Sequence, residues 1–186
     1  MSRFIVADLP IAGLKRITRQ RMGDTRGFLE RMFCSQELMA AGWQKSISQI
    51  NHTFTEKKGT VRGLHFQQSP YSEMKLVSCL RGAVFDVVVD LRANSSTYLK
   101  WHAETLTAEN GISLLVPEGL AHGFQTMTTN CEMLYSHSEL YNPKAESGLR
   151  FDDPILNITW PLELTDCSER DRNHPFLTRE FRGITA

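Results

Sequence analysis

Apolar and polar residues alternate along several short segments of this chain. In residues 84–91 (VFDVVVDL), apolar side chains occupy every second position, and Asp86 and Asp90 fall between them. Such a period of two predicts a β-strand whose two faces differ in polarity. Residues 74–80 (MKLVSCL) form a similar run that ends near Gly82, so the two runs together predict a β-hairpin.

Other segments rich in β-branched and aromatic residues are separated by Gly, Pro, Asn or Asp. The predicted strands are residues 47–54, 61–66, 112–116, 123–128, 131–136 and 156–160. A single helix is predicted over residues 35–41, with Ser35 as its N-cap and Gly42 at its end. Many short strands favour an all-β fold, and their number fits a jelly-roll antiparallel barrel with a few short helices. Residues 1–186 contain no linker or internal repeat, which predicts a single domain.

Composition narrows the partners of such a barrel. The chain has 21 Lys and Arg against 21 Asp and Glu, and this balance argues against a nucleic-acid-binding surface. Its apolar runs are far shorter than the ~20 residues of a membrane-spanning helix, and no secretory signal is apparent, so no membrane association is expected. Four widely spaced cysteines without a CxxC pair predict free thiols and a cytoplasmic location: Cys34, Cys79, Cys131 and Cys167.

Histidines are the first candidates for chemistry. His65 lies in a predicted strand, where strict alternation puts Gly63 on its face and Arg62 on the other. It is interpreted either as a hydrogen-bonded core residue or as a polar group that points into the barrel. His122 lies in a Gly-flanked turn, where a structural role, held by a nearby carbonyl, is favoured. Polar neighbours predict surface positions for His102, His137 and His174.

A metal site is the next question, since barrels of this kind often bind metals through histidines. The usual pattern has two His one residue apart, but Gly63 and Gln67 occupy the positions on either side of His65. The three ligands of an open metal site are therefore not available locally. No metal is predicted, and a metal-dependent barrel enzyme is kept as an alternative. The chain also lacks GxSxG, P-loop and GxGxxG motifs.

Seven segments together resemble the dTDP-4-dehydrorhamnose 3,5-epimerase family. They are DTRGF (24–28), QINHT (49–53), RGLHFQ (62–67), KLVSCLRGAVFDVVVDLR (75–92), LVPEGLAHGF (115–124), LYSHSELYNP (134–143) and ITWPL (158–162). They occur in family order over nearly the whole chain, which makes the combination specific. The resemblance implies a cupin-like jelly roll, a homodimer that exchanges N-terminal strands, a nucleotide-sugar substrate, and neither metal nor organic cofactor.

The family reaction inverts C3 and C5 of a nucleotide-linked 4-keto-6-deoxyhexose, converting dTDP-4-dehydro-6-deoxyglucose to dTDP-4-dehydrorhamnose. The C4 ketone acidifies both carbons, so the reaction needs a base, an acid on the opposite face, and a cation near the enolate oxygen. By resemblance, His65 is the base and Tyr135 the acid. Lys75 stabilises the enolate oxygen, and Asp171 hydrogen-bonds to the base. Tyr141 is a nearby rival for the acid.

The resemblance also implies a substrate-binding set. It consists of Arg26, Glu30, Gln49, Asn51, Arg62, His122, Glu146 and Arg170. Guanidinium groups suit the diphosphate oxygens. Arg31 stands where the family usually has an acidic residue, and Glu30 precedes it by one position. Because a one-residue slip turns a strand side chain to the other face, the preference for dTDP stays open.

Three alternatives to a 3,5-epimerase are considered. The first is a C3-only epimerase, which would use the same base and acid. The second is a sugar-nucleotide-binding protein without activity, but such a protein is expected to have lost His65, Tyr135 or Lys75. The third is the metal-dependent enzyme.

Overall fold

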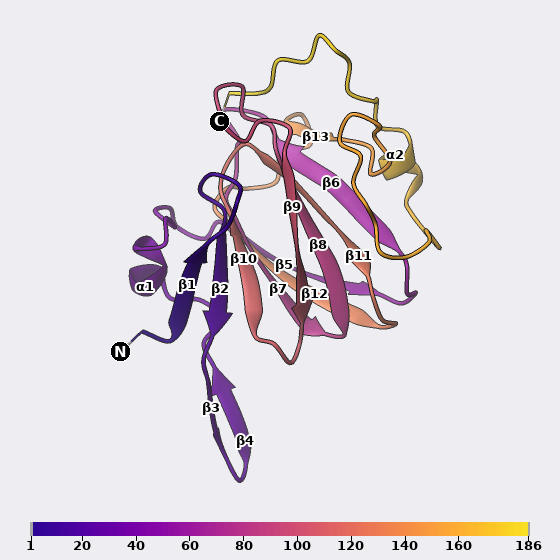
Figure 1. Ribbon diagram of the computed structural model, residues 1–186. Helices are drawn as coiled ribbons and strands as arrows, with labels where there is room; N and C mark the ends of the chain where they lie inside the picture. The colour runs from indigo at the N-terminus through magenta and orange to yellow at the C-terminus, as the bar shows by residue number, and fades with distance from the viewer. Residues whose placement is uncertain (1, 186) are drawn as a thin grey trace.

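Two antiparallel sheets form the body of the protein in the computed structural model, which describes residues 2–185 (Figure 1). The six-stranded sheet has the order β1 (Phe4–Asp8), β2 (Lys15–Arg19), β10 (Ile112–Val116), β7 (Lys75–Arg81), β12 (Cys131–His137) and β5 (Gln49–Thr55). The five-stranded sheet has the order β13 (Glu146–Gly148), β6 (Val61–Gln67), β11 (Leu120–Thr126), β8 (Ala83–Asp90) and β9 (Trp101–Thr107). The predicted all-β, jelly-roll, cupin-like fold is confirmed.

Three smaller elements complete the fold. Strands β3 (Arg21–Asp24) and β4 (Gly27–Glu30) form a separate hairpin that projects away from both sheets (Figure 1). Helix α1 (Ser35–Met39) lies beside β1, and helix α2 (Glu169–Arg172) lies near β6. No helix in the described part of the chain is long and apolar enough to cross a membrane.

Both faces of strand β8 are buried, although apolar and acidic residues alternate along it. Val84 and Val88 face the core between the two sheets, together with Val77 of β7. Val87 and Val89 pack on the other side, where the C-terminal segment covers the sheet. Asp86 and Asp90 are fully buried as well, so the polar positions of β8 face the interior of the protein and not water.

The predicted hairpin of residues 74–91 is wrong. Strand β7 pairs with β10 and β12, whereas β8 pairs with β9 and β11 in the other sheet. The chain crosses between the sheets at Gly82, whose φ of 76° is in the left-handed region. A Cβ there would lie 2.5 Å from Thr128 Oγ1, so only glycine fits this crossing. Alternation identifies a strand but not its partner.

The other sequence predictions vary in accuracy. Strands β5, β6, β10, β11 and β12 occur close to their predicted positions, while β1–β4, β9 and β13 were not predicted. Residues 156–160 form no strand. Their apolar side chains cover a sheet instead, and the Trp160 indole donates to the Phe151 carbonyl at 2.8 Å. Helix α1 is shorter than predicted, and its N-cap is Cys34, which makes no side-chain cap hydrogen bond.

Candidate active site

A cavity of about 590 Å³ opens between the two sheets. The four predicted catalytic residues line it: His65, Lys75, Tyr135 and Asp171. So do most of the predicted binding residues: Gln49, Asn51, Arg62, His122, Glu146 and Arg170. His65 belongs to the five-stranded sheet, whereas Tyr135 and Lys75 belong to the six-stranded sheet. The cavity thus places the predicted base and the predicted acid on different walls.

Two glycines shape the wall that carries His65. Gly63 has a φ of 119°, and a Cβ there would lie 2.6 Å from the Cα of Gly123 on β11. At this close approach the register between β6 and β11 shifts. A shift of this kind interrupts the alternation of side chains, so Arg62 and His65 both line the cavity. The prediction that they face opposite sides is therefore wrong.

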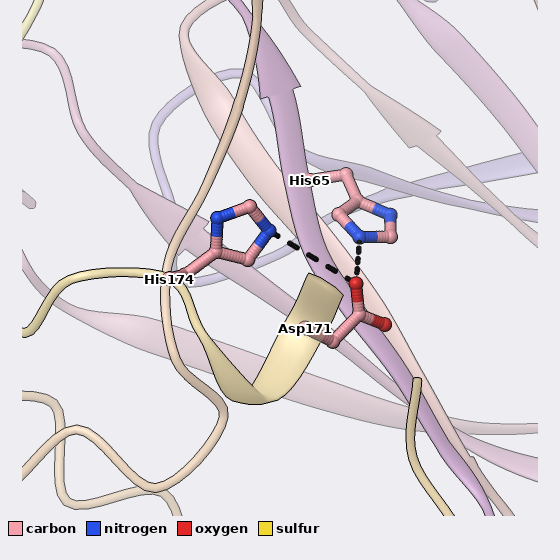
Figure 2. Close-up of side chains that lie close together, drawn as sticks. All are labelled: His65, Asp171 and His174. Carbon is pink, nitrogen blue, oxygen red and sulfur yellow. Dashed lines mark hydrogen bonds and ion pairs between the residues drawn. The ribbon is translucent and has the colours of Figure 1, made fainter. Parts of the chain in front are cut away.

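His65 and Asp171 form a hydrogen-bonded pair, with 2.7 Å between Nε2 and Oδ1 (Figure 2). Helix α2 carries Asp171, and the Ser168 hydroxyl caps this helix by accepting from the Asp171 amide at 3.1 Å. The other carboxylate oxygen accepts from the Gly63 amide at 3.1 Å. Because an ionised carboxylate only accepts, Nε2 of His65 carries the hydrogen and Nδ1 keeps a lone pair.

Asp171 also links the site to stability. Burial raises the pKa of Asp171, but the hydrogen bond and charge of His65 outweigh this and hold it at about 2, below the ordinary 3.8. At pH values above the pKa of the unfolded state, a lowered pKa in the folded state stabilises the fold. This stabilisation, ~2 kcal/mol, is lost as pH falls from ~4 to ~2.

We expect the free energy of unfolding, measured by denaturant titration, to fall less over this pH range in Asp171→Asn than in the wild type. Parallel profiles would contradict this.

Lys75 and Tyr135 supply the groups on the opposite wall. The Lys75 ammonium is almost buried, and it donates to Glu73 Oε1 at 3.1 Å and to the His65 carbonyl at 3.3 Å. Burial raises the pKa of Tyr135, which keeps its hydroxyl protonated and able to donate. A cation and a protonated tyrosine on the same wall are suited to stabilising an enolate and to protonating it.

His122 lies within β11, and not in a loop as the sequence suggested. Its Nε2 is 2.9 Å from both carboxylate oxygens of Asp86, so a carboxylate holds the ring in place of the predicted carbonyl. Burial raises the pKa of Asp86, and the charge of His122 opposes this. The His122 ring also meets the Tyr135 ring edge-on at 6.0 Å. His122 therefore packs against the predicted acid.

Polar residues surround the rest of the cavity. Arg62 donates to Thr55 Oγ1 at 2.9 Å, and the half-exposed Arg170 donates to Glu146 at 2.9 Å. The Tyr141 hydroxyl donates to the same carboxylate at 2.7 Å, so this rival for the acid also lines the cavity.

Two predicted binding residues lie outside the cavity. Arg26 is exposed on the β3–β4 hairpin, where it pairs with Asp24 at 2.5 Å. Glu30 forms an ion pair with Arg19 at 3.3 Å and accepts from Arg21 at 3.1 Å. The structure does not bring these two residues to the other predicted site residues.

Glu73 and His137 are among the cavity residues that sequence reasoning missed. His137 is largely buried, and its Nδ1 lies 2.8 Å from Glu73 Oε2, so its predicted surface position is wrong. His137 follows Tyr135 by two positions on β12, and this spacing puts both side chains on one face. That spacing was the available signal. Glu73 has none, because it precedes β7 and its partner is distant in the sequence.

His174 was also predicted at the surface. It packs instead against His65, with ring centroids 6.0 Å apart, and its Nε2 lies 4.0 Å from Asp171 Oδ1 (Figure 2). Within residues 2–185, His65, Asp171 and His174 offer three potential metal ligands within 4.8 Å of one another. The guanidinium of Arg170 lies 3.6 Å from Asp171 Oδ1, and its positive charge opposes binding of a cation.

The fold and the cavity are those of cupin-like carbohydrate epimerases. A family model described as dTDP-4-dehydrorhamnose 3,5-epimerase matches residues 8–179. The dTDP-4-dehydrorhamnose 3,5-epimerase of Sinorhizobium fredii is 41% identical over 170 residues, which cover 91% of this chain and 87% of that protein. The chain belongs to the dTDP-4-dehydrorhamnose 3,5-epimerase family. The predicted family and its isomerase class are confirmed.

Solved structures agree with this assignment. A dTDP-6-deoxy-D-glucose-3,5-epimerase from Legionella pneumophila, in complex with dTDP-4-keto-L-rhamnose, is 34% identical with a TM-score of 0.89. The match covers 93% of this chain and 92% of that one. A 3′-monoepimerase from Streptomyces bikiniensis, in complex with dTDP-quinovose, is 30% identical with a TM-score of 0.84, covering 90% and 85% of the two chains.

Proposed function

We propose that the cavity epimerises C3 and C5 of dTDP-4-dehydro-6-deoxyglucose to give dTDP-4-dehydrorhamnose. The observation that carries this proposal is the distribution of groups over two walls. His65 lies on one sheet and is hydrogen-bonded to Asp171 of helix α2, and Tyr135 and Lys75 lie on the other sheet. Inversion of a carbon next to a ketone needs a base and an acid on opposite faces of the sugar.

The proposed reaction begins when the Nδ1 lone pair of His65 takes the C3 hydrogen. The electron pair of the C–H bond moves toward the C4 oxygen and gives an enolate, which the Lys75 ammonium stabilises. Asp171 favours the imidazolium that forms, since its carboxylate accepts from Nε2. Tyr135 then protonates C3 from the opposite face. Solvent then takes the proton from His65 and returns one to Tyr135, and the same steps at C5 complete the reaction.

The proposed diphosphate ligands are Arg62 and Arg170. Both line the cavity, and a planar guanidinium binds phosphate oxygens in pairs. Arg170 is half-exposed and pairs with Glu146, so it has room to turn toward an incoming anion. The amides of Gln49 and Asn51 and the imidazole of His122 are proposed to bind the rest of the nucleotide sugar.

Solvent exchange tests the proposal directly. Purified protein in D₂O with dTDP-4-dehydro-6-deoxyglucose is expected to incorporate deuterium at C3 and C5, as read by NMR. Related keto sugars on other nucleotides test the preference for dTDP. Binding of the sugar without deuterium at either carbon would overturn the proposed reaction.

A C3-only epimerase is the second candidate, and the similarity to the Streptomyces bikiniensis 3′-monoepimerase favours it. Both reactions use the same base and acid, so these residues do not separate them. The exchange experiment does: deuterium at C3 alone identifies the C3-only reaction, and deuterium at both carbons identifies the 3,5-epimerase.

Metal removal tests the metal-dependent alternative, in which His65, Asp171 and His174 would be the ligands. We expect dialysis against EDTA to leave the exchange rate within ~2-fold, because the proposed cation is the Lys75 ammonium and not a coordinated ion. Elemental analysis of the purified protein provides the control. Stoichiometric iron, manganese or zinc, with activity lost on chelation, would support the alternative.

We further propose a cytoplasmic homodimer that exchanges N-terminal strands. The β3–β4 hairpin exposes Met22, Phe28 and Leu29, and β1 leaves one edge of its sheet unpaired within residues 2–185. Exposed apolar side chains next to a free strand edge are typical of an interface. Exchange of this hairpin would account for the distance of Arg26 from its own cavity. Four free cysteines fit a reducing compartment.

Leu29→Asp is expected to convert the dimer to a monomer, since it places a charge in the proposed apolar interface. Light scattering after size-exclusion chromatography measures the mass. Leu164→Asp is the control, because Leu164 is a partly exposed leucine outside the hairpin. A dimer that survives in Leu29→Asp would show that the hairpin is not the interface.

A further inference from the structure

Three histidines that line the cavity, His65, His122 and His137, each contact a carboxylate, and the pair formed by His137 and Glu73 has no part in the reaction proposed above. Its Glu73 carboxylate accepts from two groups at once. Oε2 lies 2.8 Å from His137 Nδ1, and Oε1 lies 3.1 Å from the Lys75 ammonium. The side chains of all three residues are at most 12% exposed. A buried carboxylate thus joins the predicted enolate-stabilising lysine to a histidine.

The far side of His137 faces the predicted substrate-binding amides. Its Nε2 lies 3.4 Å from Asn51 Nδ2. Asn51 Oδ1 in turn accepts from Gln49 Nε2 at 3.0 Å, and Gln49 Oε1 accepts from the Tyr141 amide at 3.1 Å. These contacts form one continuous network from the backbone amide of Tyr141 to Lys75.

The hydrogen bonds of this network have donors and acceptors that follow one consistent direction. Burial raises the pKa of Glu73, but the charge of Lys75 and the hydrogen bond from His137 outweigh it and keep the carboxylate ionised. An ionised carboxylate only accepts, so Nδ1 of His137 carries the hydrogen. Nε2 then accepts from the Asn51 amide, which turns Asn51 Oδ1 toward Gln49. The orientation of both amides therefore follows from the charge on Glu73.

We propose that Glu73 and His137 are positioning residues that act at two different points of the reaction. Glu73 fixes the Lys75 ammonium where the enolate oxygen forms, and His137 fixes the Asn51 amide that receives the substrate. This inference rests on the proposed function. Lysine has a long flexible stem, so its ammonium needs such an anchor to stay aligned with a developing charge.

Two variants separate these roles, because each keeps one contact and removes the other. Glu73→Gln keeps an oxygen that accepts from His137, but it removes the negative charge beside Lys75. We expect kcat for deuterium exchange to fall ~10- to 100-fold while KM changes by less than ~3-fold. A rise in KM with unchanged kcat would overturn the role of Glu73.

His137→Asn has the opposite expected effect. Its amide nitrogen takes the place of Nδ1 and still donates to Glu73, but Asn51 loses its acceptor. We expect KM to rise ~3- to 10-fold while kcat stays within ~3-fold of the wild type. A loss of kcat at constant KM would overturn the role of His137. Glu132→Gln is the matched control, because Glu132 is a carboxylate on the same strand that also contacts a histidine, His52, outside the cavity.

The tautomer of His137 gives a readout that needs no substrate. With ¹⁵N-labelled histidine, we expect the NMR spectrum to show hydrogen on Nδ1 of His137, assigned by its loss in His137→Asn. Hydrogen on Nε2 would overturn the network. An inactive wild-type protein would instead contradict the proposed function, and the tautomer would still test the arrangement of Glu73 and His137.

Discussion

Replacing His65 by alanine is expected to reduce deuterium exchange at C3 and C5 by ~10²- to 10⁴-fold, the usual contribution of a general base. The remaining cavity would still bind the nucleotide sugar, since Arg62 and Arg170 are unchanged. Rates measured by NMR in D₂O, with binding measured by calorimetry, separate the two effects. Exchange at a near wild-type rate in His65→Ala would assign the base to another residue.

Alanine at this position also leaves the buried Asp171 carboxylate without its partner, which is expected to destabilise the fold. His65→Gln avoids this, because its amide nitrogen reaches the place of Nε2 and still donates to Asp171. It is expected to fold like the wild type and to lack exchange. His52→Ala is the control, since His52 is exposed on β5 and contacts Glu132.

Tyr135→Phe is expected to separate exchange from inversion. Without the hydroxyl, the enolate has no proton donor on that face, so product formation falls by ~10²- to 10⁴-fold. His65 still removes the C3 hydrogen, and after contact with solvent it returns deuterium to the same face. NMR should therefore show deuterium at C3 of substrate that has kept its configuration.

Tyr141→Phe decides between the two tyrosines. It removes the hydroxyl that donates to Glu146 but leaves Tyr135 in place, so inversion is expected to continue. If Tyr141→Phe loses inversion and Tyr135→Phe keeps it, the acid is Tyr141. If both variants invert, the proton comes from neither residue.

Local pattern predicted most of the central strands, because burial on one or both faces leaves a clear signature in residues such as Val87 and Val89. Local pattern did not predict which strands pair with β7, because this pairing depends on contacts that are distant in the sequence. It also failed for residues 156–160, where Trp160 covers a sheet without joining it. A covering segment and a strand bury similar side chains.

The sequence motifs predicted most of the candidate site, but they did not reveal His137 and Glu73. His137 was assigned to the surface because its neighbours, Ser136 and Ser138, are polar. Ser136 lies in β12 and Ser138 directly follows it, so both alternate with His137 along the chain. Both serines are buried as well. Glu73 becomes visible only through the pairing of β7 with β12, which sets His137 opposite Lys75.

The approach of Gly63 to Gly123 has a consequence for how this enzyme can change over generations. Any side chain at either position would collide with backbone, at 2.6 Å in each case. The collision would part β6 from β11 at the residues that carry His65 and His122. Neither position therefore accommodates a side chain, and substitutions that change substrate choice are expected at other residues that line the cavity.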